Sequence, residues 1–134
     1  MTTQKSEKVD IRSSDDVVRV RQAARTLALG AGLSLVDQTK IITAASELAR
    51  NTLDYGGGGS VLADLVEVAG RRGLRLTFED QGPGIADIEV ALKDGFTSGK
   101  GMGLGLGGAK RLSNEFSIHS KPGEGTKVVI ARWK

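Results

Sequence analysis

Three short segments of this sequence carry residue types that could together bind a nucleotide and a metal ion. Glu47 and Asn51 are four residues apart, which on a helix places them on one side. Asp80 ends a stretch of alternating apolar residues and is followed at once by the turn Gln81–Gly84. The third segment, residues 99–107, alternates glycine with other residues and so has little side-chain bulk. An acid, an amide, a second acid and a glycine-rich cradle, in that order, predict a nucleotide-plus-magnesium site.

The first segment offers a metal ligand and a proton acceptor on a helix. An asparagine carbonyl oxygen suits Mg²⁺, whose other positions are filled by phosphate oxygens and waters. A carboxylate one turn away can orient or deprotonate an attacking hydroxyl. At about 100° per residue, Glu47 and Asn51 lie about 40° apart and about 90° from the middle of the apolar stripe. They are therefore expected at the rim of the buried face, although such a pair alone more often marks a solvated helix face.

The second segment offers a hydrogen-bond acceptor beside a tight turn. Gly82 and Gly84 flank Pro83, which lets the backbone turn sharply and leaves room for a flat ring. An ionised aspartate only accepts hydrogen bonds, so Asp80 can accept from an exocyclic amine such as that of adenine. Taken alone, the segment also fits a plain turn at the end of a strand.

The glycine-rich segment matches neither of two familiar phosphate-binding motifs. Gly103, Gly105 and Gly108 have the dinucleotide spacing, but no strand precedes them and no acid follows at the right distance. The stretch 95–101 is one residue short of a Walker loop and has glycine where Ser or Thr holds magnesium. What remains is a loop whose N–H groups could wrap phosphates, with Lys100 as a point charge. A surface linker is the alternative for the run in isolation.

Composition narrows the classes of protein further. The 134 residues suit one domain over 1–134, and the net charge of +3, without a basic block interleaved with aromatics, argues against nucleic acid as a partner. The absence of cysteine excludes disulfides, thiolate metal sites and thiol catalysis. Residues 1–8 are polar and expected to be flexible, and no stretch is long enough to span a membrane, so we expect a cytoplasmic protein with no membrane partner. The single histidine, His119, falls in a predicted strand and is expected to have a packing or surface role.

Periodicity predicts the elements that position these segments. Capping residues and helical spacing indicate a first helix from Ser13 to about Gly30 and a second from Ser34 to about Asp54. Alternation and turn residues indicate later strands and two short helices. The expected ranges are a short strand at 9–13, a strand pair 60–69 and 73–80 around a turn at 70–73, helices 86–93 and 107–114, and a hairpin 116–120 with 126–133. Helices followed by antiparallel strands predict an α+β two-layer sandwich.

The three segments, taken together, resemble the N, G1 and G2 boxes of the GHKL (Bergerat-fold) ATPases and kinases. This superfamily includes histidine kinases, gyrase-type ATPases and anti-sigma-factor serine kinases. The resemblance covers residues 9–134 and is closest to the small stand-alone serine/threonine kinases of bacterial stress modules. It implies a mostly antiparallel sheet covered by helices on one face. The segments that carry it are Ser46–Asn51, Glu79–Ile85, Asp94–Phe96, Lys110–Leu112, Glu115–Ile118 and Gly123–Thr126.

The resemblance also implies a role for each matching residue. Glu47 would be the catalytic acid-base residue, Asn51 the Mg²⁺ ligand, and Asp80 the acceptor for the adenine amine. The remaining residues would form the walls of the ATP site. Gly82 and Gly84 would shape the adenine turn, Lys100, Gly101, Gly103 and Gly105 would line the phosphates within an ATP lid at about 94–106, and Thr126 would help close the adenine pocket.

The activity implied is that of an ATP- and Mg²⁺-dependent protein serine/threonine kinase. Such a kinase phosphorylates a STAS-domain protein of the stressosome (RsbS/RsbR-like) and, once released, activates a downstream enzyme such as a PP2C-type phosphatase. With no phosphoacceptor-histidine helix ahead of the motifs and no second domain after them, we expect neither a self-acting histidine kinase nor a gyrase-type clamp. Two alternatives remain: an anti-sigma factor kinase that sequesters a sigma factor, and a nucleotide-bound partner-switching protein without kinase activity.

Overall fold

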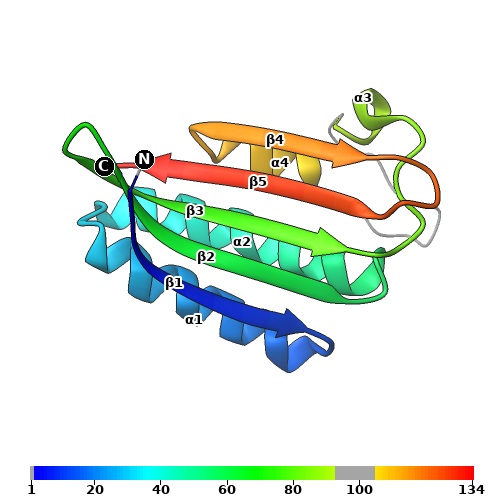
Figure 1. The fold of residues 1–134 in the computed structure, drawn as a ribbon, viewed down its shortest axis with the longest axis horizontal. Helices are drawn as coiled ribbons and strands as arrows, with labels where there is room; N and C mark the ends of the chain where they lie inside the picture. Colours follow the sequence, from blue (N-terminus) through cyan, green and yellow to red (C-terminus); the bar gives the residue numbers. More distant parts are fainter. Residues whose placement is uncertain (1, 93–104) are drawn as a thin grey trace.

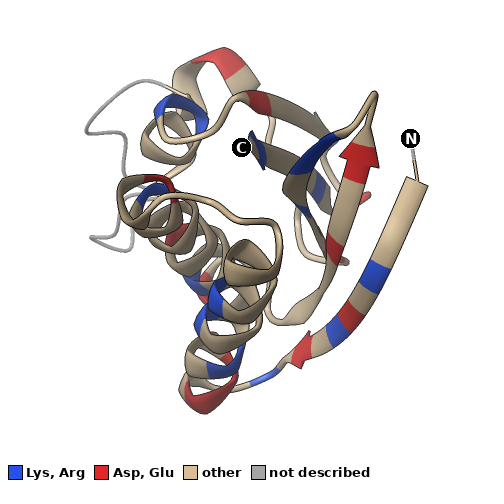
Figure 2. Cartoon of the chain, turned by 90° about the vertical axis from the view of Figure 1, so that its left-hand side faces the viewer, with Lys and Arg blue, Asp and Glu red and all other residues tan. Residues whose placement is uncertain are grey.

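The computed structural model describes residues 2–92 and 105–134, which form an antiparallel sheet with helices on one face (Figures 1 and 2). The strand order is β1-β2-β3-β5-β4, and every neighbouring pair is antiparallel. The helices are α1 (Ser14–Gly30), α2 (Leu35–Asp54), α3 (Ile88–Ala91) and α4 (Leu106–Arg111). The strands are β1 (Thr2–Ile11), β2 (Gly59–Val68), β3 (Arg71–Asp80), β4 (Glu115–Ser120) and β5 (Thr126–Trp133). The predicted α+β sandwich, with helices covering one face of an antiparallel sheet, is confirmed.

The core lies between the sheet and the apolar stripes of α1 and α2. Alternate residues of β3, namely Leu74, Leu76 and Phe78, point into it and are buried. From α2, Ile41 and Leu48 meet them with almost no exposed surface. Burying this one stripe fixes the rotation of α2 about its axis, and that rotation determines where Glu47 and Asn51 point.

The start of α2 follows the predicted capping signal. The Ser34 hydroxyl accepts a hydrogen bond from the Asp37 N–H at 3.1 Å, which satisfies one of the free donors of the first turn. Asp37 also pairs with Arg132 of β5 at 2.8 Å, and the hydrogen bond from that arginine lowers the pKa of the Asp37 carboxyl. The N-terminal end of α2 is therefore tied to the sheet.

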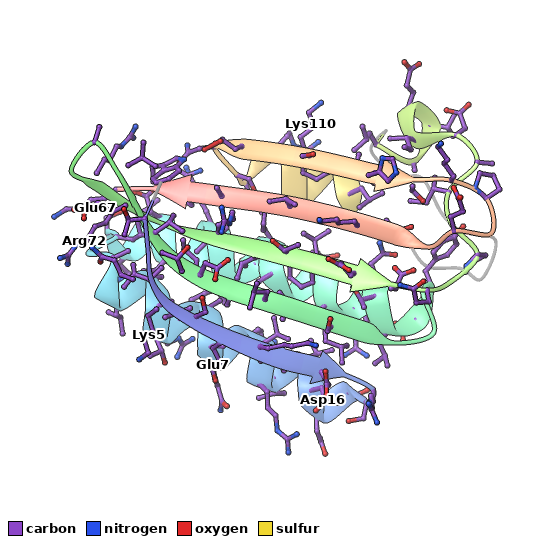
Figure 3. The ribbon with its side chains drawn as sticks, viewed as in Figure 1. Lys5, Glu7, Asp16, Glu67, Arg72 and Lys110 are labelled. Atoms are coloured by element: carbon purple, nitrogen blue, oxygen red, sulfur yellow. The ribbon has the colours of Figure 1, made fainter. Side chains whose placement is uncertain are left out.

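The junction between β1 and α1 is built around a buried acid, Asp16. Asp16 lies at the start of α1, beside the end of β1 (Figure 3). Its carboxylate accepts from the backbone N–H of Arg12 at 2.8 Å and of Ser13 at 3.1 Å, and pairs with Arg19 at 2.9 Å. These partners, the Arg12 N–H first, lower the pKa of Asp16.

Strand β1 differs from the sequence prediction. Residues 2–8, expected to be flexible, form most of a ten-residue edge strand that pairs with β2, for example Val9 with Val61. The polar side chains of this strand face solvent, so composition alone suggested a loose terminus. Backbone pairing with β2 needs no apolar side chains, which is why the composition gave no signal.

The short helices also differ in extent from their predicted ranges. Helix α3 occupies only Ile88–Ala91, and α4 runs from Leu106 to Arg111 rather than over 107–114. Helix α4 ends before residue 114 because Asn114 forms hydrogen bonds with strand β5. Its N–H donates to the Ala131 carbonyl at 2.8 Å, and its side-chain oxygen accepts from the Trp133 N–H at 2.7 Å.

The β2–β3 turn is shorter than predicted. Arg71 and Arg72 belong to β3, opposite Val68 and Glu67, so the expected turn at 70–73 is wrong. The loop consists of Ala69 and Gly70 alone, with φ of 52° and 79°. Positive φ at both central residues is the type I′ geometry, which matches the twist of a two-residue hairpin. Ala69 therefore occupies a backbone conformation that alanine disfavours.

Replacing Ala69 with asparagine should raise the free energy of unfolding by about 0.5–1 kcal/mol, because asparagine tolerates the left-handed region. Urea unfolding checks this. Gly70→Ala is the matched opposite change: an added methyl group meets no atom within 4 Å, so only the backbone conformation opposes it. It should lower stability by about 1 kcal/mol. Equal losses for both variants would contradict the turn assignment.

Candidate nucleotide-binding site

Four residues face one another across four strands at one end of the sheet. Gly59 of β2 lies opposite Asp80 of β3, Asp80 opposite Thr126 of β5, and Thr126 opposite Ser120 of β4. Directly opposed residues of antiparallel strands share a face. Asp80, Thr126 and Ser120 are buried, and Asp80 follows the core residues Leu74–Phe78 on the helix-covered face. We call Asp80, Thr126 and Ser120 the polar row.

Asp80 is the acidic member of the polar row, and the residue is only 8% exposed. Its Oδ1 accepts a hydrogen bond from the Gly82 N–H at 2.9 Å. Burial raises the pKa of Asp80, and hydrogen bonds from the backbone amides of Gly82 and Thr126 work in the opposite direction. Burying a carboxyl at the end of a strand costs free energy and indicates a site used for more than folding.

Glycines surround this carboxyl because the backbone approaches it closely. A methyl group on Gly56 would lie 2.5 Å from Cγ of Asp80, and one on Gly82 would lie 2.7 Å from the Gly56 backbone. Gly84 has a φ of 75°, and its added methyl group would collide with the Lys121 carbonyl oxygen. The space beside Gly82 and Gly84 is thus occupied by neighbouring backbone, which holds the turn after Asp80 in one shape.

Two further residues that hold this turn were not identified from the sequence. The Tyr55 hydroxyl donates to the Gly84 carbonyl at 2.8 Å, linking the end of α2 to the turn. The Ser120 hydroxyl accepts from the Ile85 N–H at 2.8 Å and contacts the Thr126 hydroxyl at 2.8 Å. An aromatic residue just before the Gly56–Gly59 run was a usable signal for Tyr55, whereas nothing in the local sequence marks Ser120.

Asn51 lies on α2 with its side-chain oxygen sealed from solvent. Among the described residues, its Oδ1 is the buried side-chain atom that has no hydrogen-bond partner. An unsatisfied buried carbonyl costs free energy, so the site suits a ligand that supplies a cation or a donor. Within the described residues no group of three or more His, Cys, Asp or Glu could hold a metal. One protein oxygen supplemented by phosphate oxygens and waters is nevertheless a normal Mg²⁺ arrangement.

Glu47 lies one turn before Asn51 and is exposed. It borders a groove of about 460 Å³ between α1 and α2, which Arg21 and Arg25 also line. On its other side is Gly105, the residue before α4, with a φ of 68°. A methyl group there would lie 2.6 Å from Oε2 and 3.1 Å from Cβ of Glu47, so a larger residue would require the Glu47 side chain to shift.

The end of α2 brings the two parts of the site together. The Asn51 backbone carbonyl accepts from the N–H groups of Tyr55 and Gly56 at 2.9 and 3.1 Å. Gly56 in turn lies against the Asp80 carboxyl. The structure thus connects Asn51 to Asp80, Gly82, Gly84 and Thr126. Lys100, Gly101 and Gly103, with nearly all of the expected lid at 94–106, lie outside the described residues.

Asp80 offers a hydrogen-bond acceptor that suits the amino group of a nucleotide base. Asn51 offers an oxygen ligand that suits a metal ion. The sequence family described as histidine kinase-, DNA gyrase B- and HSP90-like ATPases matches residues 36–134. The chain therefore belongs to this ATPase family, as the resemblance to GHKL proteins predicted. It is also 46% identical over 125 residues to the serine/threonine-protein kinase RsbT of Bacillus subtilis (strain 168), covering 93% of this chain and 94% of that protein. It is therefore an RsbT-like member of this family.

Solved structures share the fold at low sequence identity. The RsbU and RsbW domains of Rv1364c from Mycobacterium tuberculosis match with a TM-score of 0.66 at 20% identity, over 98% of this chain and 33% of that one. The SiaB–SiaC complex from Pseudomonas aeruginosa matches with a TM-score of 0.56 at 15% identity, over 98% and 91% of the chains. No helix in the described part of the chain is long and apolar enough to cross a membrane.

Asp80→Asn is expected to weaken ATP binding yet stabilise the protein without nucleotide near neutral pH. Because the folded-state pKa of Asp80 is raised above its ordinary value of 3.8, its burial costs stability once the unfolded chain is ionised. That cost is absent below the ordinary pKa and complete above the folded-state pKa. Urea unfolding at about pH 7 and about pH 4 should therefore show an advantage for the variant that shrinks on acidification.

Asp64→Asn is the matched control for this prediction. Asp64 is also buried, but it pairs with Arg75 at 3.0 Å and accepts from the Ser6 hydroxyl. Its replacement should destabilise the protein near pH 7, because one partner of a buried pair is removed. Destabilisation by Asp80→Asn at the same pH would contradict the account of Asp80.

Proposed function

We propose that this chain binds ATP with Mg²⁺ and transfers the γ-phosphoryl group to a serine or threonine of a STAS-domain protein. The observation that carries the proposal is the buried Oδ1 of Asn51, which has no hydrogen-bond partner among the described residues. Asn51 lies one helical turn from Glu47 and is linked through Gly56 to Asp80. The identity of 46% to RsbT supports the reaction type. Each part of the reaction then falls to a different residue.

Asp80 binds the base and Asn51 the metal. The Asp80 carboxylate accepts from the exocyclic amine of adenine, and its backbone partners hold it in one orientation. Asn51 would hold Mg²⁺ through Oδ1, an atom that makes no hydrogen bond to the other described residues and so keeps its lone pairs for a cation. The ion supplies neutralisation of phosphate charge, the main requirement of phosphoryl transfer. We further propose that Lys100, Gly101, Gly103 and Gly105 line the phosphates.

Glu47 receives the acceptor hydroxyl. Its carboxylate is exposed at the groove between α1 and α2, so a side chain from another protein can reach it. Within hydrogen-bond reach of a serine or threonine hydroxyl, Glu47 orients it and accepts its proton as the phosphoryl group is transferred.

The partners are proposed from the relatives. An RsbS/RsbR-like STAS protein is the substrate class we infer from the identity to RsbT, and a PP2C-type phosphatase is the inferred effector after release. The solved SiaB–SiaC complex supports the idea that a protein of this fold can work through a stable complex. An anti-sigma role has less support, because the relative with 46% identity is named a serine/threonine-protein kinase.

Transfer of label from γ-labelled ATP to a STAS-domain protein, with Mg²⁺ present, tests the proposal. Glu47→Gln should bind ATP as the wild type does and slow transfer by about 10²–10⁴-fold, since it removes the proton acceptor without changing the size of the side chain. Glu7→Gln, on the exposed strand β1, is the control and should transfer label normally.

Two results would contradict parts of this account. Normal transfer by Glu47→Gln would show that another group accepts the proton. A stable complex between the wild-type protein and the STAS protein without any label would favour the partner-switching alternative without kinase activity.

A further inference from the structure

The Ser120 hydroxyl sits among three buried partners at the end of the polar row. It lies 2.8 Å from the Ile85 backbone N–H, 2.9 Å from the Gly125 carbonyl oxygen and 2.8 Å from the Thr126 hydroxyl oxygen. Ser120, Gly125, Thr126 and Ile85 are all buried. The proposed roles of Asp80 and Asn51 make no use of this cluster, although Thr126 lies directly opposite Asp80.

The chemistry of these partners determines the direction of every hydrogen bond in the cluster. A backbone N–H only donates and a carbonyl only accepts, whereas a hydroxyl has one proton and two lone pairs. Ile85 therefore donates to Ser120, and the single Ser120 proton is needed by the Gly125 carbonyl. The contact between the two hydroxyls is then satisfied only if Thr126 donates its proton to Ser120. Leaving a buried group unpaired costs free energy, which favours this pattern over the others.

The Thr126 hydroxyl is thereby left as an acceptor toward the rest of the site. Its proton is committed to Ser120, so its Oγ1 offers only a lone pair in other directions. Asp80, opposite it on the same face of the sheet, also presents acceptor oxygens. Two neighbouring acceptors suit an amino group, which carries two N–H donors, or a water that donates to both. They do not suit a carbonyl oxygen.

We propose that Ser120 is a specificity-determining positioning residue that makes the site prefer 6-aminopurine over 6-oxopurine nucleotides. Ser120 acts through Thr126, by fixing that hydroxyl as an acceptor, and touches no substrate itself. The inference rests on the nucleotide site proposed above. Without the Ser120 hydroxyl, the Thr126 hydroxyl rotates freely and donates to a 6-oxo group as readily as it accepts from a 6-amino group.

Dissociation constants of ATP and ITP, measured by calorimetry with Mg²⁺ present, test this inference. The wild type should prefer ATP by about tenfold or more, because ITP brings a carbonyl to a site made of acceptors. Ser120→Ala should reduce that preference to about threefold or less, chiefly by tighter binding of ITP. Ser120→Thr, which keeps the hydroxyl on a β-strand, should restore it.

A control variant and a second variant at Thr126 allow the test to decide even if Ser120→Ala does not fold. Ser117→Ala, at an exposed position of the same strand β4, should leave the ATP/ITP ratio unchanged. Thr126→Val removes the acceptor while Ser120 keeps its bonds to Ile85 and Gly125, so it should also lower the ratio even if Ser120→Ala fails to fold. Combining Ser120→Ala with Thr126→Val should lower the ratio no further than Thr126→Val alone, since both act through one hydroxyl.

The results separate this inference from the nucleotide site itself. An unchanged ATP/ITP ratio in Thr126→Val, or in folded Ser120→Ala, would overturn the inference while leaving the ATP site standing. Failure of the wild type to bind ATP at all would overturn the site and the inference with it.

Discussion

The buried carboxyl of Asp80 is the constraint around which the rest of the site is arranged. Its burial raises its pKa, and among the described residues it accepts hydrogen bonds from the backbone amides of Gly82 and Thr126. Such amides can reach it only if the chain turns at once after β3 and β5 lies directly opposite, and both conditions are met. The bare backbone of Gly56 seals the other side. The glycines around Asp80 therefore serve close packing, and the carboxyl that results has acceptor capacity left for a ligand.

Helix α2 connects this carboxyl to the reactive end of the site. Its apolar stripe packs on the sheet and fixes its rotation, which places Asn51 at the rim of the core and Glu47 outside it. Its C-terminal turn then passes through Tyr55, which holds Gly84, and Gly56, which packs on Asp80. A single helix thus sets the spacing between the base end and the metal end. The metal, the STAS substrate and the catalytic roles remain proposals built on that spacing.

Much of this fold could be predicted from the sequence because its signals are local. The N-cap at Ser34, the stripe of α2 and the alternation in β3 each specify an element within a few residues. Only the end of strand β1 could be predicted, as the short strand expected at 9–13; residues 2–8 could not, because their polar side chains give no sign of the backbone pairing with β2. The exact position of the Ala69–Gly70 turn was not predicted, because alanine is not a typical turn residue. The role of Ser120 was not predicted for a different reason. It depends on a hydrogen bond from Ile85, 35 residues away in sequence, and on the pairing of β4 with β5.

The most direct test of the central claim is to follow backbone and side-chain amides by NMR as nucleotide is added. ATP with Mg²⁺ should shift the Gly82 and Thr126 backbone amides, which bond to the Asp80 carboxyl, and the Asn51 side-chain amide. Adenosine alone should shift the first two and leave Asn51 unchanged, because it carries no phosphate and recruits no metal. Shifts confined to other surfaces, such as the groove between β1 and α1, would contradict the site described here.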